Sequence, residues 1–347
     1  MQTFVISVLV FGLIILVHEF GHFLAARALG VKVLEFAVGF GPQLFSVRRK
    51  ETAYSLRVVP LGGFVRLAGT NPEEDDMDDP RGFNNQPVLR RMAIIFAGPL
   101  MNFMLAVALF SYIAFSYGIA TPITSTTVVG DVIPGYPAAE AGLQAGDTIV
   151  RVDGVEVTAW DDLVRLIQQS PGRPLVLTVL RDGETIMLTV VPVENQQQPG
   201  KGFIGIAPPV NISRPGFLGA VEAGARRTVD VTVVWIRSLV LMVLNRIEAD
   251  IAGPVGIGRL VGQALEMGLA NLLYLAGALS ANIGLFNLLP IPALDGSRLV
   301  FLGIEGVRGR PIDPEKENFI HFVGFVLMML LIVVVTYQDI AKLDLGG

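Results

Sequence analysis

Apolar residues fill four stretches of the chain that are long enough to cross a bilayer. A transmembrane helix needs about 20 mainly apolar residues in a row. The sequence therefore predicts four transmembrane helices, at residues 1–30, 91–118, 267–304 and 318–338. A cleaved signal peptide is not expected at the first stretch, because the apolar run is too long and charged residues interrupt it.

The segment 216–247 is also apolar but contains Asp230 and Arg237. It is expected to be an amphipathic helix that lies on the membrane surface. The Gly-Pro-Val-Gly-Ile sequence within the next segment, 248–266, is expected to break the chain, so that this segment connects the surface helix to the third span. A short tail, 339–347, is expected to close the chain.

Between the first two spans the pattern of apolar and polar residues changes from one typical of a helix to one typical of short strands. Short strands are expected at 31–36, 44–47 and 54–59, so residues 31–70 predict a small β-hairpin sheet associated with the membrane. The segment 71–90 opens with a run of acidic residues and is expected to be a solvated cytoplasmic linker.

Residues 122–210 lack transmembrane character and predict an inserted soluble α+β domain. Its sequence resembles the PDZ pattern, with a helix expected at 160–169 and strands at 175–181 and 185–191. In similar bacterial modules, a segment like Gly202, Phe203, Ile204, Gly205 and Ile206 receives a peptide carboxylate, which implies binding of peptide C-termini. The alternative is a packed edge without a ligand.

Composition agrees with this architecture, a polytopic α-helical membrane protein. Hydrophobic residues make up 52% of the 347 residues, and the mean hydropathy is +0.59. The net charge of -5 is spread along the chain without a basic face, so no nucleic-acid partner is expected. With no cysteine, the chain has no disulfide, no thiolate metal ligand and no cysteine nucleophile.

Ionisable residues stand out inside the first span, in the sequence His18-Glu19-Phe20-Gly21-His22. Such groups are costly in a membrane and therefore indicate function. Residues four apart share one face of a helix, so His18 and His22 can bind the same ion, and Glu19 can reach a water beside it. Zinc suits this set, and one Zn²⁺ per chain is expected, with Glu19 as general base in amide hydrolysis.

The expected topology supplies a third ligand. Lys and Arg cluster after the first and third spans, which places those connections in the cytoplasm and both termini and the soluble domain outside. His18, His22 and Asp295 then lie at one depth, towards the cytoplasmic leaflet. Asp295 could instead cap a helix.

Two further polar residues in the spans allow more than one interpretation. Asn102 in the second span could bond a neighbouring helix or take part in the site as a substrate or oxyanion contact. His321 opens the fourth span and is expected to be interfacial rather than a ligand.

Two motifs, HExxH at 18–22 and NxxPxPxLDG at 287–296, make the chain resemble the site-2 protease family of intramembrane zinc metalloproteases. The resemblance extends over nearly the whole chain to the bacterial regulator of sigma-E protease branch, although only one PDZ domain fits here. It implies a multi-pass protein of the bacterial inner membrane that cleaves single-span membrane proteins, such as anti-sigma factors or signal-peptide remnants.

The resemblance also implies roles for particular residues. His18, His22 and Asp295 would be zinc ligands, Glu19 the catalytic residue, and Asn287 a group near the substrate or oxyanion. The hairpin at 31–70 would pair with an unwound substrate. The alternative function is a noncatalytic membrane adaptor that binds peptide C-termini through its PDZ domain.

Overall fold

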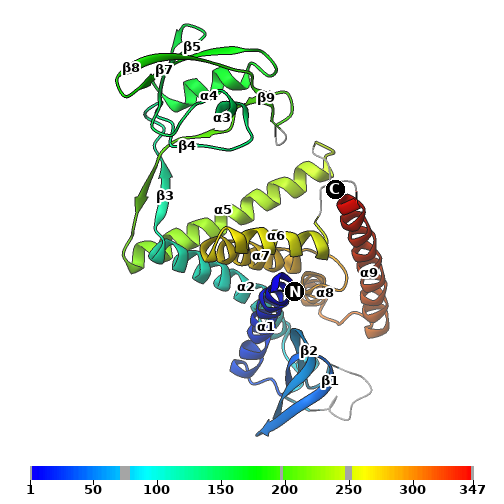
Figure 1. The fold of residues 1–347 in the computed structure, drawn as a ribbon. Coiled ribbons are helices and arrows are strands. Elements are labelled where there is room, and N and C mark those ends of the chain that lie inside the picture. The colour runs from blue at the N-terminus through cyan, green and yellow to red at the C-terminus, as the bar shows by residue number, and fades with distance from the viewer. Residues whose placement is uncertain (1, 71–78, 196–197, 247–251, 345–347) are drawn as a thin grey trace. The chain divides into compact units, whose positions relative to one another are not determined.

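The structure is a computed structural model that describes residues 2–70, 79–195, 198–246 and 252–344 (Figure 1). The chain forms two compact units. The membrane unit comprises the chain up to Tyr117 and from Gly216 onwards, and the inserted unit is Gly118–Pro215. Most of the acidic run expected in the linker 71–90 lies outside the described residues.

Seven long helices make up most of the described membrane unit. They are α1 (Gln2–Ala28), α2 (Val88–Ser116), α5 (Phe217–Val243), α6 (Pro254–Glu266), α7 (Leu269–Leu288), α8 (Asp295–Arg308) and α9 (Pro314–Asp344). Four of the described helices, α1, α2, α7 and most of α9, are long and apolar enough to span a membrane. Each of these four helices overlaps one of the four predicted stretches.

One prediction of helix extent is wrong. The segment 267–304 is not one helix, because α7 ends at Leu288 and α8 begins at Asp295. Pro290 and Pro292 lie between them, and proline removes a backbone donor and clashes with the preceding turn. The connecting segment 248–266 contains α6, and Pro254 occupies the first turn of this helix, where its fixed φ favours a helix.

Small residues bring the helices of the membrane unit close to α2. A β-carbon on Gly21 of α1 would lie 2.3 Å from the carbonyl oxygen of Ala97, and one on Gly224 of α5 would lie 2.2 Å from Ser111 Oγ. Close approach of backbones through small residues is the usual way that helices associate within a bilayer. The other face of α5 exposes apolar side chains such as Val233, and its predicted place on the membrane surface stays a prediction.

The strands β1 (Val33–Arg49) and β2 (Thr52–Leu67) form an antiparallel sheet after α1 (Figure 1). Residues 33–40 pair on one side with 59–67 and on the other with 53–56, whereas 43–49 pair with 52–57. The sheet therefore has four segments, and the expectation of three short strands missed 59–67. Gly39, Gly41 and Gly62 adopt positive φ, so these glycines form irregularities within long strands rather than ending them.

The segment 59–67 of β2 lies against α1. A β-carbon on Gly12 would come within 2.7 Å of the carbonyl oxygen of Pro60, and one on Gly62 within 2.5 Å of the Ile15 side chain. Phe23 of α1, Leu67 of β2 and Ile94 of α2 belong to one buried cluster. The sheet is therefore fixed to the helix that carries the two histidines of the HExxH motif.

The inserted unit contains a four-stranded antiparallel sheet in the order β6-β5-β7-β8. Three further strand pairs, β3 with β12, β4 with β11 and β9 with β10, complete it. Its strands and helices are β3 (Ile119–Pro122), β4 (Asp131–Val132), α3 (Pro137–Glu140), β5 (Thr148–Val152), β6 (Val155–Glu156), α4 (Trp160–Gln168), β7 (Leu175–Arg181), β8 (Glu184–Val190), β9 (Val193–Glu194), β10 (Gly202–Phe203), β11 (Ile206–Ala207) and β12 (Val210–Ser213). The helix and two strands predicted at 160–191 coincide with α4, β7 and β8 to within one residue.

Candidate metal centre

Three predicted ligands meet in the membrane unit. His18 and His22 lie one turn apart on α1, and Asp295 is the first residue of α8. Asp295 Oδ2 is 3.0 Å from His18 Nε2 and 3.3 Å from His22 Nε2, and the two Nε2 atoms are 3.2 Å apart. All three side chains are at least four-fifths buried. Among the described residues, this is the one group of His, Asp and Glu side chains with metal-ligand spacing.

The spacing of these three atoms fits a tetrahedral zinc site. Zinc lies about 2.0–2.1 Å from histidine nitrogen and carboxylate oxygen, so two ligand atoms at tetrahedral angles are about 3.3 Å apart. The three observed separations, 3.0–3.3 Å, are close to that value. The donor set leaves the fourth position of a tetrahedron open, as catalytic zinc sites do.

The hydrogen bond of His22 prepares its Nε2 atom for a metal. His22 Nδ1 lies 2.8 Å from the backbone carbonyl oxygen of Ile94 in α2. A carbonyl oxygen can only accept, so Nδ1 carries the proton and Nε2 keeps its lone pair. Metal-binding histidines are commonly oriented by such a bond at the second ring nitrogen.

Asn102 lies behind His18 in the same way. Its amide is completely buried, and the amide nitrogen is placed 3.3 Å from His18 Nδ1, while the oxygen Oδ1 has no partner. The two ends of an amide are assigned from the hydrogen-bond network. Rotating the amide by 180° lets Oδ1 accept from His18 Nδ1–H, which satisfies the buried oxygen and again leaves Nε2 unprotonated. Ser280 of α7 donates to the Asn102 backbone carbonyl oxygen at 2.8 Å and fixes this turn of α2.

Glu19 is next to the three ligands and faces the β-sheet. Its carboxylate lies beside both histidines and Asp295, and the backbone N–H of Val65 points towards it from β2. Val65 belongs to the segment 59–67, which lies along α1, and it pairs with Phe36 of β1. The candidate base therefore lies between the ligand atoms and the edge of a β-strand.

The start of α8 is held in place by close backbone packing. A β-carbon on Gly296 would lie 2.1 Å from the carbonyl oxygen of Leu289, so only glycine allows α8 to begin this close to the end of α7. Ser297 Oγ donates to the Leu294 carbonyl oxygen at 2.7 Å. At the other end of α8, Glu305 accepts a hydrogen bond from the Arg91 guanidinium of α2.

Two other residues singled out in the sequence make hydrogen bonds outside the three-ligand group. Asn287 donates to the carbonyl oxygen of Ile283 at 2.9 Å, one turn earlier in α7. His321 is not part of the three-ligand group and instead accepts a hydrogen bond from the backbone N–H of Ala293. Sequence reasoning missed the contributions of Ile94 and Val65, because both act through backbone groups that leave no signal in residue type.

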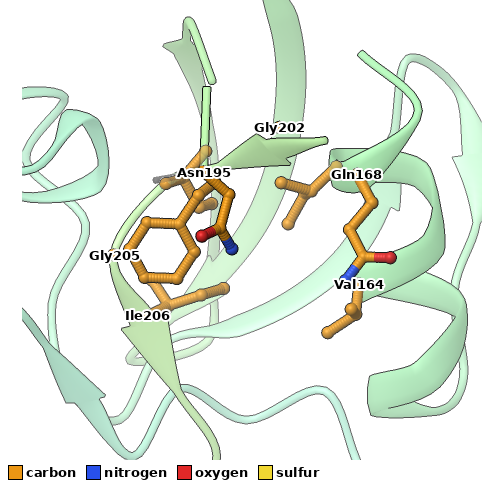
Figure 2. A pocket seen from close by; sticks show the side chains of 9 residues that line it. Val164, Gln168, Asn195, Gly202, Gly205 and Ile206 are labelled. Atoms are coloured by element: carbon orange, nitrogen blue, oxygen red, sulfur yellow. The ribbon is translucent and has the colours of Figure 1, made fainter. Parts of the chain in front are cut away.

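The inserted unit has a pocket of about 150 Å³ where the sequence predicts a peptide-binding loop. Figure 2 shows Val164 and Gln168 of α4 on one side of it and the segment from Gly202 to Ile206 on the other. Asn195 also lines this pocket (Figure 2). A β-carbon on Gly202 would lie 2.3 Å from the Ile167 carbonyl oxygen, so β10 packs tightly on the last turn of α4.

Comparison with known proteins connects this geometry to a family. A model of peptidase family M50 matches residues 6–331. The regulator of sigma-W protease RasP of Bacillus subtilis is 33% identical over 425 residues, covering 99% of this chain and 99% of that protein. Zinc metalloprotease RasP of Oceanobacillus iheyensis is 32% identical over 432 residues, covering 99% of this chain and 100% of that protein.

Among solved structures, the PDZ domain of the SdrC-like protein of Listeria innocua matches with a TM-score of 0.22 and 21% identity, covering 24% of this chain and 92% of that domain. The family match includes both histidines and Asp295, and the relatives align over nearly the whole chain. The chain therefore belongs to peptidase family M50 and is a multi-pass membrane zinc metalloprotease of the site-2 type.

Proposed function

We propose that this protease cleaves single-span membrane proteins within the bilayer, using one Zn²⁺ held by His18, His22 and Asp295 and Glu19 as general base. The observation that carries the proposal is the convergence of three ligand atoms at 3.0–3.3 Å with Glu19 beside them. Both histidines project from α1, a helix of 27 residues that is apolar enough to span a membrane.

When bound, zinc lowers the pKa of a water in its fourth position and polarises the carbonyl of the peptide bond to be cut. Glu19 takes a proton from the attacking water and then gives it to the leaving amine. The Glu19 carboxylate lies between the ligands and the Val65 N–H of the β-sheet.

Asn102 orients His18 in this proposal. Its buried amide, in contact with His18 Nδ1, supports this role more than the contact with substrate or oxyanion that the sequence also allowed. Asn287 donates a hydrogen bond to the backbone of Ile283 in its own helix. A role for Asn287 near the substrate is proposed only because the resemblance to the family implies it.

The segment 59–67 of β2 is the proposed binding edge for substrate. It pairs with residues 33–40 on one side only, and it lies next to Glu19 at Val65. A helical substrate hides its peptide bonds, whereas an unwound substrate that adds a strand to this edge exposes one bond beside the ligands.

The relative from Bacillus subtilis is named a regulator of sigma-W, and we extend this to the class of substrate here. Anti-sigma factors with one membrane span, or remnants of signal peptides, are the proposed substrates. We propose that the protein lies in the inner membrane with both termini and the inserted unit outside, and with the active site towards the cytoplasmic leaflet. The pocket of the inserted unit is proposed to bind peptide C-termini.

The experiment compares purified wild-type protein with Glu19→Gln for zinc content and for cleavage of a single-span substrate. Glu19→Gln is expected to keep zinc and to lose cleavage by at least about a hundredfold, the low end of what a general base contributes. Glu222→Gln, at an exposed ion pair on α5, is the matched control and should cleave normally. Equal cleavage by wild type and Glu19→Gln would exclude the mechanism, and zinc-free wild type would exclude the ligand set.

A further inference from the structure

The turn in front of Asp295 has an unfavourable backbone conformation. Ala293 adopts φ +75, which is in the left-handed region. Residues with a β-carbon rarely adopt it, because the β-carbon crowds the following carbonyl oxygen. Pro292 precedes this residue and Asp295 follows two positions later, so the path of the chain into the candidate site depends on a turn that its own sequence disfavours.

His321 supports this turn from another helix. Its Nδ1 atom accepts a hydrogen bond of 3.1 Å from the backbone N–H of Ala293. Its ring also lies 5.8 Å, centroid to centroid, from Phe301 of α8, in an edge-to-face arrangement. One side chain of α9 thus contacts both the turn and the helix on either side of Asp295.

The backbone of α9 is shaped for the same contact. Gly324 lies one turn after His321 and is buried. A β-carbon on Gly324 would lie 2.3 Å from Pro292 Cβ and 2.7 Å from the Pro292 carbonyl oxygen. Glycine therefore lets α9 lie directly on the residue before Ala293, and this close approach places His321 within reach of the Ala293 N–H.

The other nitrogen of the His321 ring does not suggest a separate site. Because Nδ1 accepts from Ala293, Nε2 carries the proton in the neutral ring. Nε2 is buried, and the Glu317 Oε1 atom is 3.8 Å from it, beyond the range of a hydrogen bond. The one well-formed bond of this histidine is thus directed at the turn.

We propose that His321 is a positioning residue, which holds Ala293 in its left-handed conformation and thereby sets Asp295 at the distance from His18 and His22 that metal binding requires. The inference rests on the proposed role of Asp295 as a zinc ligand. It assigns to the fourth span a function in the site, although none of the three proposed ligands belongs to that span.

The test measures zinc per chain in the full-length protein after equilibration with a graded series of chelator concentrations, together with cleavage. His321→Leu removes the acceptor and is expected to release zinc at an about tenfold lower chelator concentration, as with other residues that support ligands. His321→Asn places a carbonyl oxygen near the position of Nδ1 and is expected to restore retention. Phe322→Leu, at the next residue, which is 63% exposed, is the control and should behave as wild type.

A double variant separates positioning from a general role in folding. Glycine adopts positive φ without strain, so Ala293→Gly makes the turn less dependent on its support. Ala293→Gly combined with His321→Leu should recover most of the zinc retention that His321→Leu loses. If His321→Leu does not fold, His321→Gln, which keeps a polar side chain but moves its acceptor away from Nδ1, takes its place in the same series.

Three results would overturn the inference. Wild-type zinc retention in His321→Leu, or in His321→Gln where that variant replaces it, would show that the hydrogen bond does not matter. A loss that neither His321→Asn nor Ala293→Gly corrects would show a role in folding alone. Asp295→Asn is measured alongside. If Asp295→Asn keeps full zinc, the proposed ligand set has failed, and the inference fails with it. If Asp295→Asn loses zinc while the His321 variants retain zinc as wild type does, only the inference is refuted.

Discussion

Gly98 of α2 lies so close to His22 of α1 that a β-carbon on it would come within 2.4 Å of the Nε2 atom that faces Asp295. The added β-carbon would also lie 2.8 Å from Nε2 of His18. A methyl group there would contact both nitrogens and the space between them, or force α1 and α2 apart. We expect Gly98→Ala to lose most bound zinc and nearly all cleavage, as measured by metal content and a cleavage assay.

Gly303→Ala is the matched control for this substitution. Gly303 lies within α8, and a β-carbon on it would meet no other atom within 4 Å. Alanine is favoured over glycine in a helix, so this variant should keep zinc and be equally or slightly more stable. Full zinc retention by Gly98→Ala would mean that α2 does not approach the histidines as described.

The contact between Asn102 and His18 predicts a graded effect on metal binding. Asn102→Leu removes the acceptor for His18 Nδ1–H and leaves that donor buried, so zinc affinity should fall by about tenfold to a hundredfold. Asn102→Asp keeps an oxygen at the same place and should retain much more zinc. Equal zinc affinity in wild type and Asn102→Leu, measured by chelator competition, would contradict the proposed orientation of His18.

The sequence predicts the three proposed ligands because they obey simple rules. His18 and His22 are four residues apart on an apolar helix, and Asp295 lies near the end of the third predicted stretch, at the depth that the distribution of charge predicts. These residues lie together in the structure. The supporting contacts could not be predicted, since the Ile94 carbonyl and the Val65 N–H are backbone groups, and the bond from Ala293 to His321 joins residues 28 positions apart.

The β-sheet shows a second limit of the sequence pattern. The segment 59–67 contains Pro60, Gly62 and Gly63, which usually indicate a turn. In the structure these residues lie where β2 touches α1, and a β-carbon on Gly63 would come within 2.3 Å of the Ala37 carbonyl oxygen. Close packing of the backbone against a neighbour, rather than a turn, therefore explains the glycines, and only the tertiary structure distinguishes the two.

The pocket of the inserted unit can be closed by one substitution. Val164 of α4 is partly buried and lines the pocket. Val164→Trp adds a large ring at this position, so a peptide C-terminus should bind at least tenfold more weakly, as measured by fluorescence titration with a labelled peptide. Met187→Trp, on a side chain that is 75% exposed, adds the same ring away from the pocket and should leave binding unchanged. Normal binding by Val164→Trp would place the peptide elsewhere.

Stability of the inserted unit should depend on pH through Asp147, whose side chain is 1% exposed. The Arg181 guanidinium donates to both of its oxygens at 2.7 Å, and this interaction holds the pKa of Asp147 below its usual range despite burial. The pKa in the unfolded chain is higher, about 3.9. The stabilisation is therefore complete above the unfolded value and is lost as the pH falls through the folded value. The unfolding temperature of this unit should decrease steadily below about pH 4.

Two arginine variants distinguish this pair from surface charge in general. Arg181→Gln leaves the Asp147 carboxylate buried without its cation, so the unfolding temperature at pH 7 should fall by several degrees. The difference in unfolding temperature between Arg181→Gln and wild type should then become smaller as the pH drops below about 4, because protonated Asp147 carries no charge for the cation to balance. Arg165→Gln, which removes an exposed pair with Asp162, should change little at any pH. A constant difference between Arg181→Gln and wild type across this range would show that Arg181 acts through packing instead of charge.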